Sequence, residues 1–169
     1  MFMKSKSAAV QFAAFLLAVV PSALQAQTKI GVEGAISAVN GTTIELYNGQ
    51  VKISAEGAKI DTEDPNFKNV SDLKVGTFID VEAVVERDGS IHATLIEVSD
   101  EKDQVPEVGG VVGTVDTAAQ TFTIGPLTVH WTNQTKLKDL PAVRAGIKVE
   151  ARVAFASGKL VAELIEKDE

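Results

Sequence analysis

Few residues of this 169-residue chain have side chains suited to catalysis. The chain contains no cysteine and two histidines, His92 and His130. Nucleophilic catalysis needs an activated serine, cysteine, threonine or lysine beside an orienting base, and zinc or copper sites usually cluster histidine or cysteine. Each histidine lies between two apolar residues that suit the buried face of a strand, so both rings should point toward solvent. The sequence therefore predicts no enzyme, no catalytic residue, no zinc or copper site and no cofactor.

Oxygen ligands for a hard cation are concentrated in one acidic segment, residues 61–72. The candidate residues are Asp61, Glu63, Asp64, Asn66 and Asp72. An EF-hand loop that began at Asp61 would place Pro65 at a ligand position and Asn66 where the turn glycine belongs. The segment is therefore better explained as a solvated acidic loop than as a metal site. We assign no metal ligand and keep these five residues as the candidate contact with a cation or a partner.

Acidic residues outnumber basic ones, 23 against 16, which gives the chain a net charge of −7. The excess is uneven, because residues 27–104 hold 15 acidic and 7 basic residues whereas residues 105–169 hold 8 and 7. Proteins bind nucleic acids through lysine and arginine, which neutralise the phosphates, so we expect no nucleic-acid partner. The acidic first half predicts instead an unknown protein or a small cationic ligand as the partner.

The N-terminus has the pattern of a secretory signal peptide. Lys4 and Lys6 precede an apolar run at residues 8–20, and a short stretch of mostly small residues follows at 22–26. The run is shorter than the roughly 20 residues that span a bilayer as a helix. We therefore expect cleavage after Ala26, no membrane insertion afterwards, and a periplasmic or secreted bacterial protein. Without cysteine, neither lipid attachment nor a disulfide is available to it.

The rest of the chain contains an internal repeat of two similar copies. Residues 31–36 resemble residues 110–115, and the stretch ATLIE at 93–97 returns as AELIE at 162–166. Apolar residues alternate with acidic ones from residue 79 onward, the pattern of a strand with one buried face. Hairpin turns are predicted at the Asn-Gly and Asp-Gly pairs, which accept positive φ values. The alternation slips at Leu95-Ile96 and again at Leu164-Ile165, which predicts a β-bulge in each copy.

The two copies differ most within residues 61–72, where the first copy has seven extra residues. Asp64 followed by Pro65 predicts the start of a short helix in this insertion. Between the copies, residues 99–110 are polar and contain Pro106 and two glycines, which is typical of a linker. The predicted organisation is a signal peptide at 1–26, a first domain at 27–99, a linker at 100–109 and a second domain at 110–169. We expect the two domains to fold separately.

These motifs resemble a bacterial family of small β domains known as domain of unknown function 5666, which are similar to OB-fold barrels. The resemblance rests on Gly34-x-Ile36, on Leu73-Lys74-Val75-Gly76 before an acid-alternating strand, and on Asp88-Gly89 before the repeated strand; it covers residues 31–98 and, more loosely, 110–166. It implies an all-β fold of two tandem small OB-like antiparallel β barrels after the signal peptide. The motifs are glycines and core positions, so they imply a shape and no catalytic residues.

OB-type barrels often bind nucleic acids or sugars through exposed aromatic side chains. We align Trp131 with Ile53, which predicts that Trp131 belongs to the core. Tyr47 lies out of phase beside an Asn-Gly turn and is expected to be exposed, but one tyrosine is too little for a stacking surface. The sequence therefore favours an exported, non-enzymatic binding or interaction module that contacts its partner through the acidic first domain. The alternative is a structural spacer of the cell envelope whose acidity serves only solubility.

Overall fold

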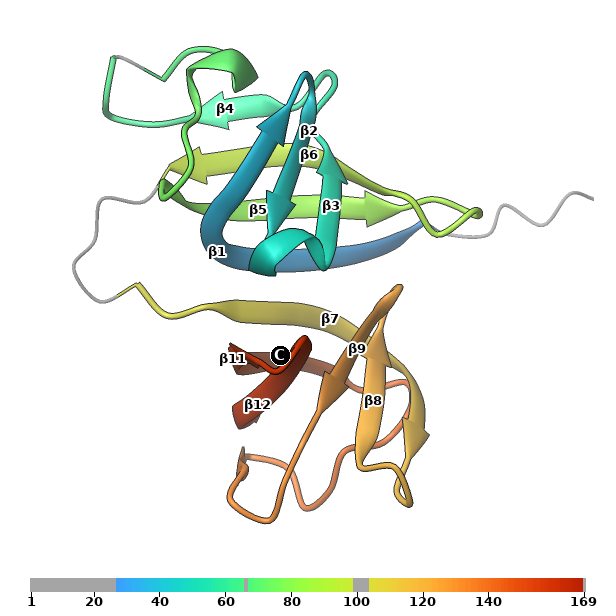
Figure 1. Ribbon diagram of the computed structural model, residues 1–169. Coiled ribbons are helices and arrows are strands. Elements are labelled where there is room, and N and C mark those ends of the chain that lie inside the picture. Colours follow the sequence, from blue (N-terminus) through green and yellow to red (C-terminus); the bar gives the residue numbers. More distant parts are fainter. Residues whose placement is uncertain (1–26, 66, 99–103, 169) are drawn as a thin grey trace, which may run out of the picture.

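The computed structural model of the protein describes residues 27–65, 67–98 and 104–168. The predicted signal peptide, residues 1–26, lies outside the described residues. The described chain forms two β barrels, which Figure 1 shows one above the other. Within this part of the chain, no helix combines the length and the apolar character needed to cross a membrane.

The first barrel is a closed ring of five strands. They are β1 (Thr28–Asn40), β2 (Thr43–Leu46), β3 (Val51–Ser54), β5 (Phe78–Val85) and β6 (Ile91–Val98). β1 pairs antiparallel with β2 and β5, β2 pairs antiparallel with β3, β5 pairs antiparallel with β6, and β3 runs parallel to β6 and closes the ring. A short strand, β4 (Lys59–Asp61), extends the sheet parallel to β6. A five-stranded barrel of this kind is OB-like.

The second barrel repeats the first strand by strand. Its strands are β7 (Glu107–Asp116), β8 (Thr121–Ile124), β9 (Leu127–His130), β10 (Lys136–Lys138), β11 (Lys148–Ala156) and β12 (Lys159–Lys167). β7 pairs with β8 and β11, β8 with β9, β11 with β12, and β9 and β10 both run parallel to β12. The predicted fold, all-β with two tandem OB-like barrels, is confirmed.

Strand pairing corrects the alignment of the two copies at two places. Gly34 lies opposite Ile79 as Gly110 lies opposite Val149, so these glycines are counterparts and the sequence match of 31–36 with 110–115 is three residues out of register. The error arises because glycines recur at a spacing of three in both segments. Trp131 is likewise the counterpart of Ala55 and not of Ile53, because its backbone N–H bonds back to the preceding hairpin in the same way, at 3.0 Å and 2.8 Å.

The predicted β-bulges are present in both copies. The pairing register shifts between Glu82 and Ala83 in the first barrel and between Arg152 and Val153 in the second. One extra residue, Thr94 or Glu163, is inserted in the partner strand just before the Leu-Ile pair. The bulge moves the next buried side chain to the correct face, which explains why alternation slips there in the sequence.

The short helix of the insertion forms at a different place from the one predicted. A single 3-10 turn, η2 (Val70–Asp72), begins after Asn69, and Asp64-Pro65 starts no helix. Asn69 and Asp72 satisfy each other's backbone N–H groups as a capping box. This reciprocal cap provides two bonds to backbone donors, which makes residue 69 a better starting point than a single Asp-Pro pair.

The two barrels are joined by pairing between β1 and β7, which Figure 1 shows running side by side between them. The pairs run from Ile30↔Gly110 to Glu33↔Glu107, with Val32 and Val108 opposite each other and fully buried. β7 begins at Glu107, inside the range 100–109 that the sequence predicts as linker. Buried apolar side chains of both barrels form one connected cluster. We call the β1–β7 contact and its surroundings the joint.

Tyr47 belongs to this joint, so the prediction that it is exposed is wrong. The turn η1 (Tyr47–Gly49), in which Tyr47 and Asn48 have positive φ values of 51° and 54°, directs the ring inward and leaves the residue 8% exposed. The ring lies 6.4 Å from that of Phe155 in the second barrel. Its hydroxyl donates to the carbonyl oxygen of Glu33 and lies 3.4 Å from that of Glu107. The sequence contained no sign of this role, because the second barrel that covers Tyr47 is distant in the chain.

Candidate acidic cleft between the barrels

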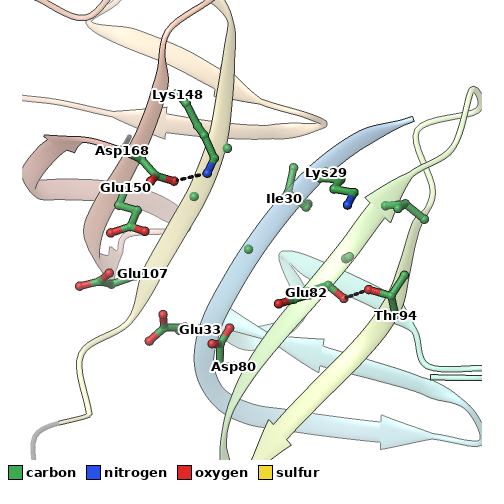
Figure 2. Close-up of a pocket in the computed structure, with 15 residues that line it drawn as sticks. Lys29, Ile30, Glu33, Asp80, Glu82, Thr94, Glu107, Lys148, Glu150 and Asp168 are labelled. Atoms are coloured by element: carbon green, nitrogen blue, oxygen red, sulfur yellow. Dashed lines mark hydrogen bonds and ion pairs between the residues drawn. The ribbon is translucent and has the colours of Figure 1, made fainter. Parts of the chain in front are cut away.

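A cleft of about 590 Å³ runs along the outer side of the joint and is lined by both barrels. Its carboxylates are Glu33, Asp80, Glu82, Glu107, Glu150 and Asp168, and its cations are Lys29 and Lys148. Figure 2 shows Glu33, Asp80 and Glu107 gathered at one end, with Glu150 and Asp168 on the wall of the second barrel. We call this feature the acidic cleft.

Strand register explains why so many carboxylates meet here. Along one row that crosses both barrels, Glu97 lies opposite Asp80, Asp80 opposite Glu33, Glu33 opposite Glu107 and Glu107 opposite Arg152. Directly opposite residues of an antiparallel pair point to the same face. The acidic residues that alternate with core residues along β5 and β1 therefore form a continuous line on the outer surface of the joint.

The neighbouring row has glycines at its centre. Glu82 lies opposite Gly31, Gly31 opposite Gly109, and Gly109 opposite Glu150. A side chain at Gly31 would meet no heavy atom within 4 Å, so the space above it is open. The middle of the cleft thus has a floor of backbone between two acidic walls, and a ligand could approach the main chain there.

Mutual repulsion and burial shape the electrostatics of the cleft. Burial raises the pKa of Asp80 above its ordinary value, and the charges of Glu97, Glu82, Glu107 and Glu150 raise it further. The pKa of Glu150 is also raised, first by burial and then by Asp168, Glu107 and Glu166. Two ion pairs offset part of the charge, Arg152 with Glu107 at 2.9 Å and Lys148 with Asp168 at 2.7 Å.

The carboxylates are spread along the strands instead of converging on one point. Among the described residues, no group of three or more His, Cys, Asp or Glu side chains is placed to hold a metal ion. An isolated divalent ion needs several oxygen ligands at about 2.0–2.6 Å. The arrangement instead suits a ligand whose positive charges are distributed along its length.

The candidate residues in the insertion have mainly local roles. Asp61 is paired with Lys59 at 2.5 Å, and this bond lowers the pKa of Asp61. Asp72 accepts backbone N–H bonds from Lys68 and Asn69 at 3.0 and 2.9 Å, which lower its pKa.

Glu63 and Asp64 are exposed, and the backbone N–H of Asp64 donates to the hydroxyl of Thr62. Asn66 lies outside the described residues. Of the five candidates, Asp61 and Asp72 are thus occupied by neighbours within the first barrel. Whether the loop contacts a partner stays a prediction.

The histidines lie on the outer faces of their strands and are both partly exposed. The Ser90 hydroxyl oxygen lies 2.6 Å from an Asp88 carboxylate oxygen and 3.1 Å from Nε2 of His92. In a catalytic triad the histidine stands between the acid and the nucleophile, whereas here the serine stands between the other two. This arrangement stabilises the hairpin turn and leaves the ring without an orienting carboxylate from Asp88.

Sequence reasoning missed the cleft itself. It recognised that Asp80 and Glu82 point outward, because they alternate with core residues. Their meeting with Glu107 and Glu150 depends on β1 pairing with β7, which no local pattern encodes. The only hint in the sequence was the set of glycines at positions 31, 109 and 110, which permit close approach of two backbones.

Comparison with known proteins agrees with this architecture. The family described as Domain of unknown function (DUF5666) matches residues 33–97 and again residues 109–166. The first matched segment lies within the first barrel and the second within the second barrel. No curated protein and no solved structure matched the chain. The chain belongs to the DUF5666 family, of which it carries two tandem copies.

Proposed function

We propose that the protein is an exported, non-enzymatic binding module that holds an extended cationic ligand in the acidic cleft. The ligand class is a polyamine or a lysine- or arginine-rich segment of another protein. The observation that carries this proposal is the row of carboxylates that both barrels contribute to one cleft. Export is inferred from the signal peptide predicted at residues 1–26.

Spacing favours an extended ligand over a compact ion. Neighbouring strands lie about 4.8 Å apart, so the register-paired carboxylates that line the cleft, Asp80 of β5, Glu33 of β1 and Glu107 of β7, are spread over two such steps. A chain of amines separated by a few methylene groups can meet successive carboxylates, whereas a single metal ion reaches only those around one point. Gly31 leaves room for the hydrocarbon part of such a chain against the backbone, because a Cβ there would meet no heavy atom within 4 Å.

A structural spacer of the envelope is the second candidate function. It is favoured by the acidic segment at residues 61–72, where Asp61 is bound by Lys59 of β4 and Asp72 by the backbone N–H groups of Lys68 and Asn69. A spacer needs negative charge for solubility only, so it predicts no ligand that depends on the cleft.

Isothermal titration calorimetry with spermidine distinguishes the binding module from the structural spacer. We expect measurable heat at low salt that weakens as salt rises, because the interaction is electrostatic. The variant Glu33→Gln/Asp80→Asn should weaken binding roughly tenfold, a loss of about 1.4 kcal/mol. Calcium serves as the compact-ion probe and should give no comparable heat.

The matched control is Glu56→Gln/Glu63→Gln, which removes the same charge from exposed positions outside the cleft. We expect it to bind spermidine as the unaltered protein does. If spermidine gives no heat with the unaltered protein, the spacer becomes the better explanation. Equal losses in both variants would place the contact in the insertion or in the general negative field.

A further inference from the structure

The joint is built from carboxylates that face one another across strands. Glu33 stands directly opposite Asp80 of β5 on one side and Glu107 of β7 on the other. Asp80 in turn stands between Glu33 and Glu97, so its register neighbours on both sides are acidic. Like charges placed directly opposite each other destabilise a pair of strands. The contact between the barrels therefore includes repulsion that disappears when the carboxyl groups are protonated.

We propose that the acidic row Glu97, Asp80, Glu33 and Glu107 makes the joint a pH-sensitive element, which tightens the contact between the barrels in acidic medium and loosens it at neutral pH. This inference concerns the joint of the protein itself and does not depend on any ligand. It rests on the register of the strands and on the position of the row across the only ladder that joins the described barrels.

Charged groups of every neighbouring element lie near this row. β4 adds Asp61, which lies opposite Glu97 and is paired with Lys59. β5 adds Glu82, β11 adds Lys148, Glu150 and Arg152, β1 adds Lys29, and the C-terminal segment adds Asp168. Arg152 is engaged with Glu107 and Lys148 with Asp168. The hydroxyl of Tyr47 stays protonated, because burial raises its pKa well above the ordinary value. The balance around Asp80 is therefore acidic.

The direction of the effect follows from the raised pKa of Asp80. A carboxyl group whose pKa is higher in the folded protein binds its proton more tightly there than in the unfolded chain. Its stabilising contribution is complete below the ordinary value of 3.8 and is lost as the pH rises through the raised value. Glu150 acts in the same sense from the other barrel.

Carboxyl groups elsewhere act in the opposite sense. The pKa values of Asp61, Asp72 and Asp88 are lowered by hydrogen bonds, so their contributions are lost as the pH falls. These groups lie in β4, η2 and the β5–β6 turn, and none of them lines the cleft. A global melting curve would mix the two effects, so the test must report on the joint itself.

Amide hydrogen exchange followed by NMR gives that local measurement on the chain beginning at Gln27, which contains every residue described. Protection at residues 30–33 and 107–110 is compared with protection in the β2–β3 hairpin, after correction for intrinsic exchange. Between about pH 7.5 and about pH 4, where carboxyl groups whose pKa is raised above its ordinary value take up protons, joint protection should rise about fivefold relative to the hairpin. In Glu33→Gln/Asp80→Asn it should change less than about twofold.

Hydrogen exchange at raised ionic strength provides a second, independent test that needs no variant. Raising ionic strength at neutral pH screens repulsion between partly exposed carboxylates, so it should also increase protection at the joint of the unaltered protein. The control Glu56→Gln/Glu63→Gln should keep the full pH response. Equal pH responses in the joint variant and the unaltered protein, or an unaltered joint that responds to neither pH nor salt, would overturn the proposal.

Discussion

The two barrels contact each other through equivalent turns that carry residues of opposite size. In the first barrel, the turn between β2 and β3 presents Tyr47 to Phe155 of the second barrel. In the second barrel, the turn between β8 and β9 presents Gly125, whose Cα faces Val85 so closely that a Cβ would stand 2.9 Å from a Val85 methyl carbon. One turn carries a large side chain, and the equivalent turn of the other barrel carries glycine, which has no side chain. The two barrels therefore contact each other without two-fold symmetry.

The same difference appears in the cleft. Asp80 and Glu150 occupy equivalent positions and both have raised pKa values. Their neighbours across the strands differ, because Asp80 faces Glu33 whereas Glu150 faces Gly109. The row through Asp80 therefore concentrates negative charge, while the row through Glu150 leaves open space. Two copies of one barrel have diverged into a charged half and an open half of a single cleft.

Separating the barrels is the strongest way to test how far they have become dependent on each other. Separate folding of residues 27–104 and 105–169 stays a prediction, and each fragment loses the β1–β7 ladder. We expect both to fold, with the first melting above the second and both at least about 10 °C below the intact chain, since 1 kcal/mol shifts the melting temperature of a domain this small by about 4–8 °C.

Circular dichroism melting of the two fragments and of the chain from Gln27 provides the measurement. If both fragments are unfolded while the intact chain melts in a single step, the barrels form one cooperative unit. The domain boundary predicted near residue 100 would then be wrong in energetic terms, whatever the strand order.

Replacing Tyr47 should give the next largest effect. Tyr47→Ala removes a buried ring that contacts Phe155 and a hydroxyl bonded to the Glu33 carbonyl, and should lower the free energy of unfolding by about 3–5 kcal/mol. Tyr47→Phe keeps the ring and should cost about 1 kcal/mol. Denaturant titration measures both, and equal costs for the two variants would mean that packing against Phe155 contributes nothing.

Much of the fold could be read from the sequence, because its signals are local. Alternation along β5, the Asp88-Gly89 turn and the slipped Leu95-Ile96 pair all act within a few residues of each other, and each was interpreted correctly. The copies were recognised for the same reason. The sequence alignment of the two copies was wrong at Gly31, because the repeated glycines allow more than one alignment. Only the strand pairing shows which alignment is correct.

The site was much less predictable than the fold. Asp61 and Asp72 attracted attention because acids are dense in that segment, yet a nearby lysine and two backbone N–H groups bind them. Glu33 and Glu107 lie far apart in the sequence and become neighbours only through the joint. Tyr47 was misjudged for the same reason, since the residues that bury it belong to the other copy.

The smallest expected effect comes from comparing two glycines of the β1–β7 ladder, Gly110, which lies opposite Ile30, and Gly31, which lies opposite Gly109. Gly110 has φ of +148°, and a Cβ there would stand 2.9 Å from the Ile124 Cγ2 atom and 3.1 Å from the carbonyl oxygen of Lys29. Gly110→Ala should therefore destabilise the protein by about 1–3 kcal/mol, because the backbone is unfavourable for alanine and β1 must move away. Gly31→Ala adds a methyl group into open space and should change stability by less than about 0.5 kcal/mol. Denaturant midpoints of the two variants and the unaltered chain test the contrast, because both substitutions add the same atoms to the same ladder. If Gly31→Ala is as costly as Gly110→Ala, the close approach of β7 to β1 is not what requires glycine at position 110.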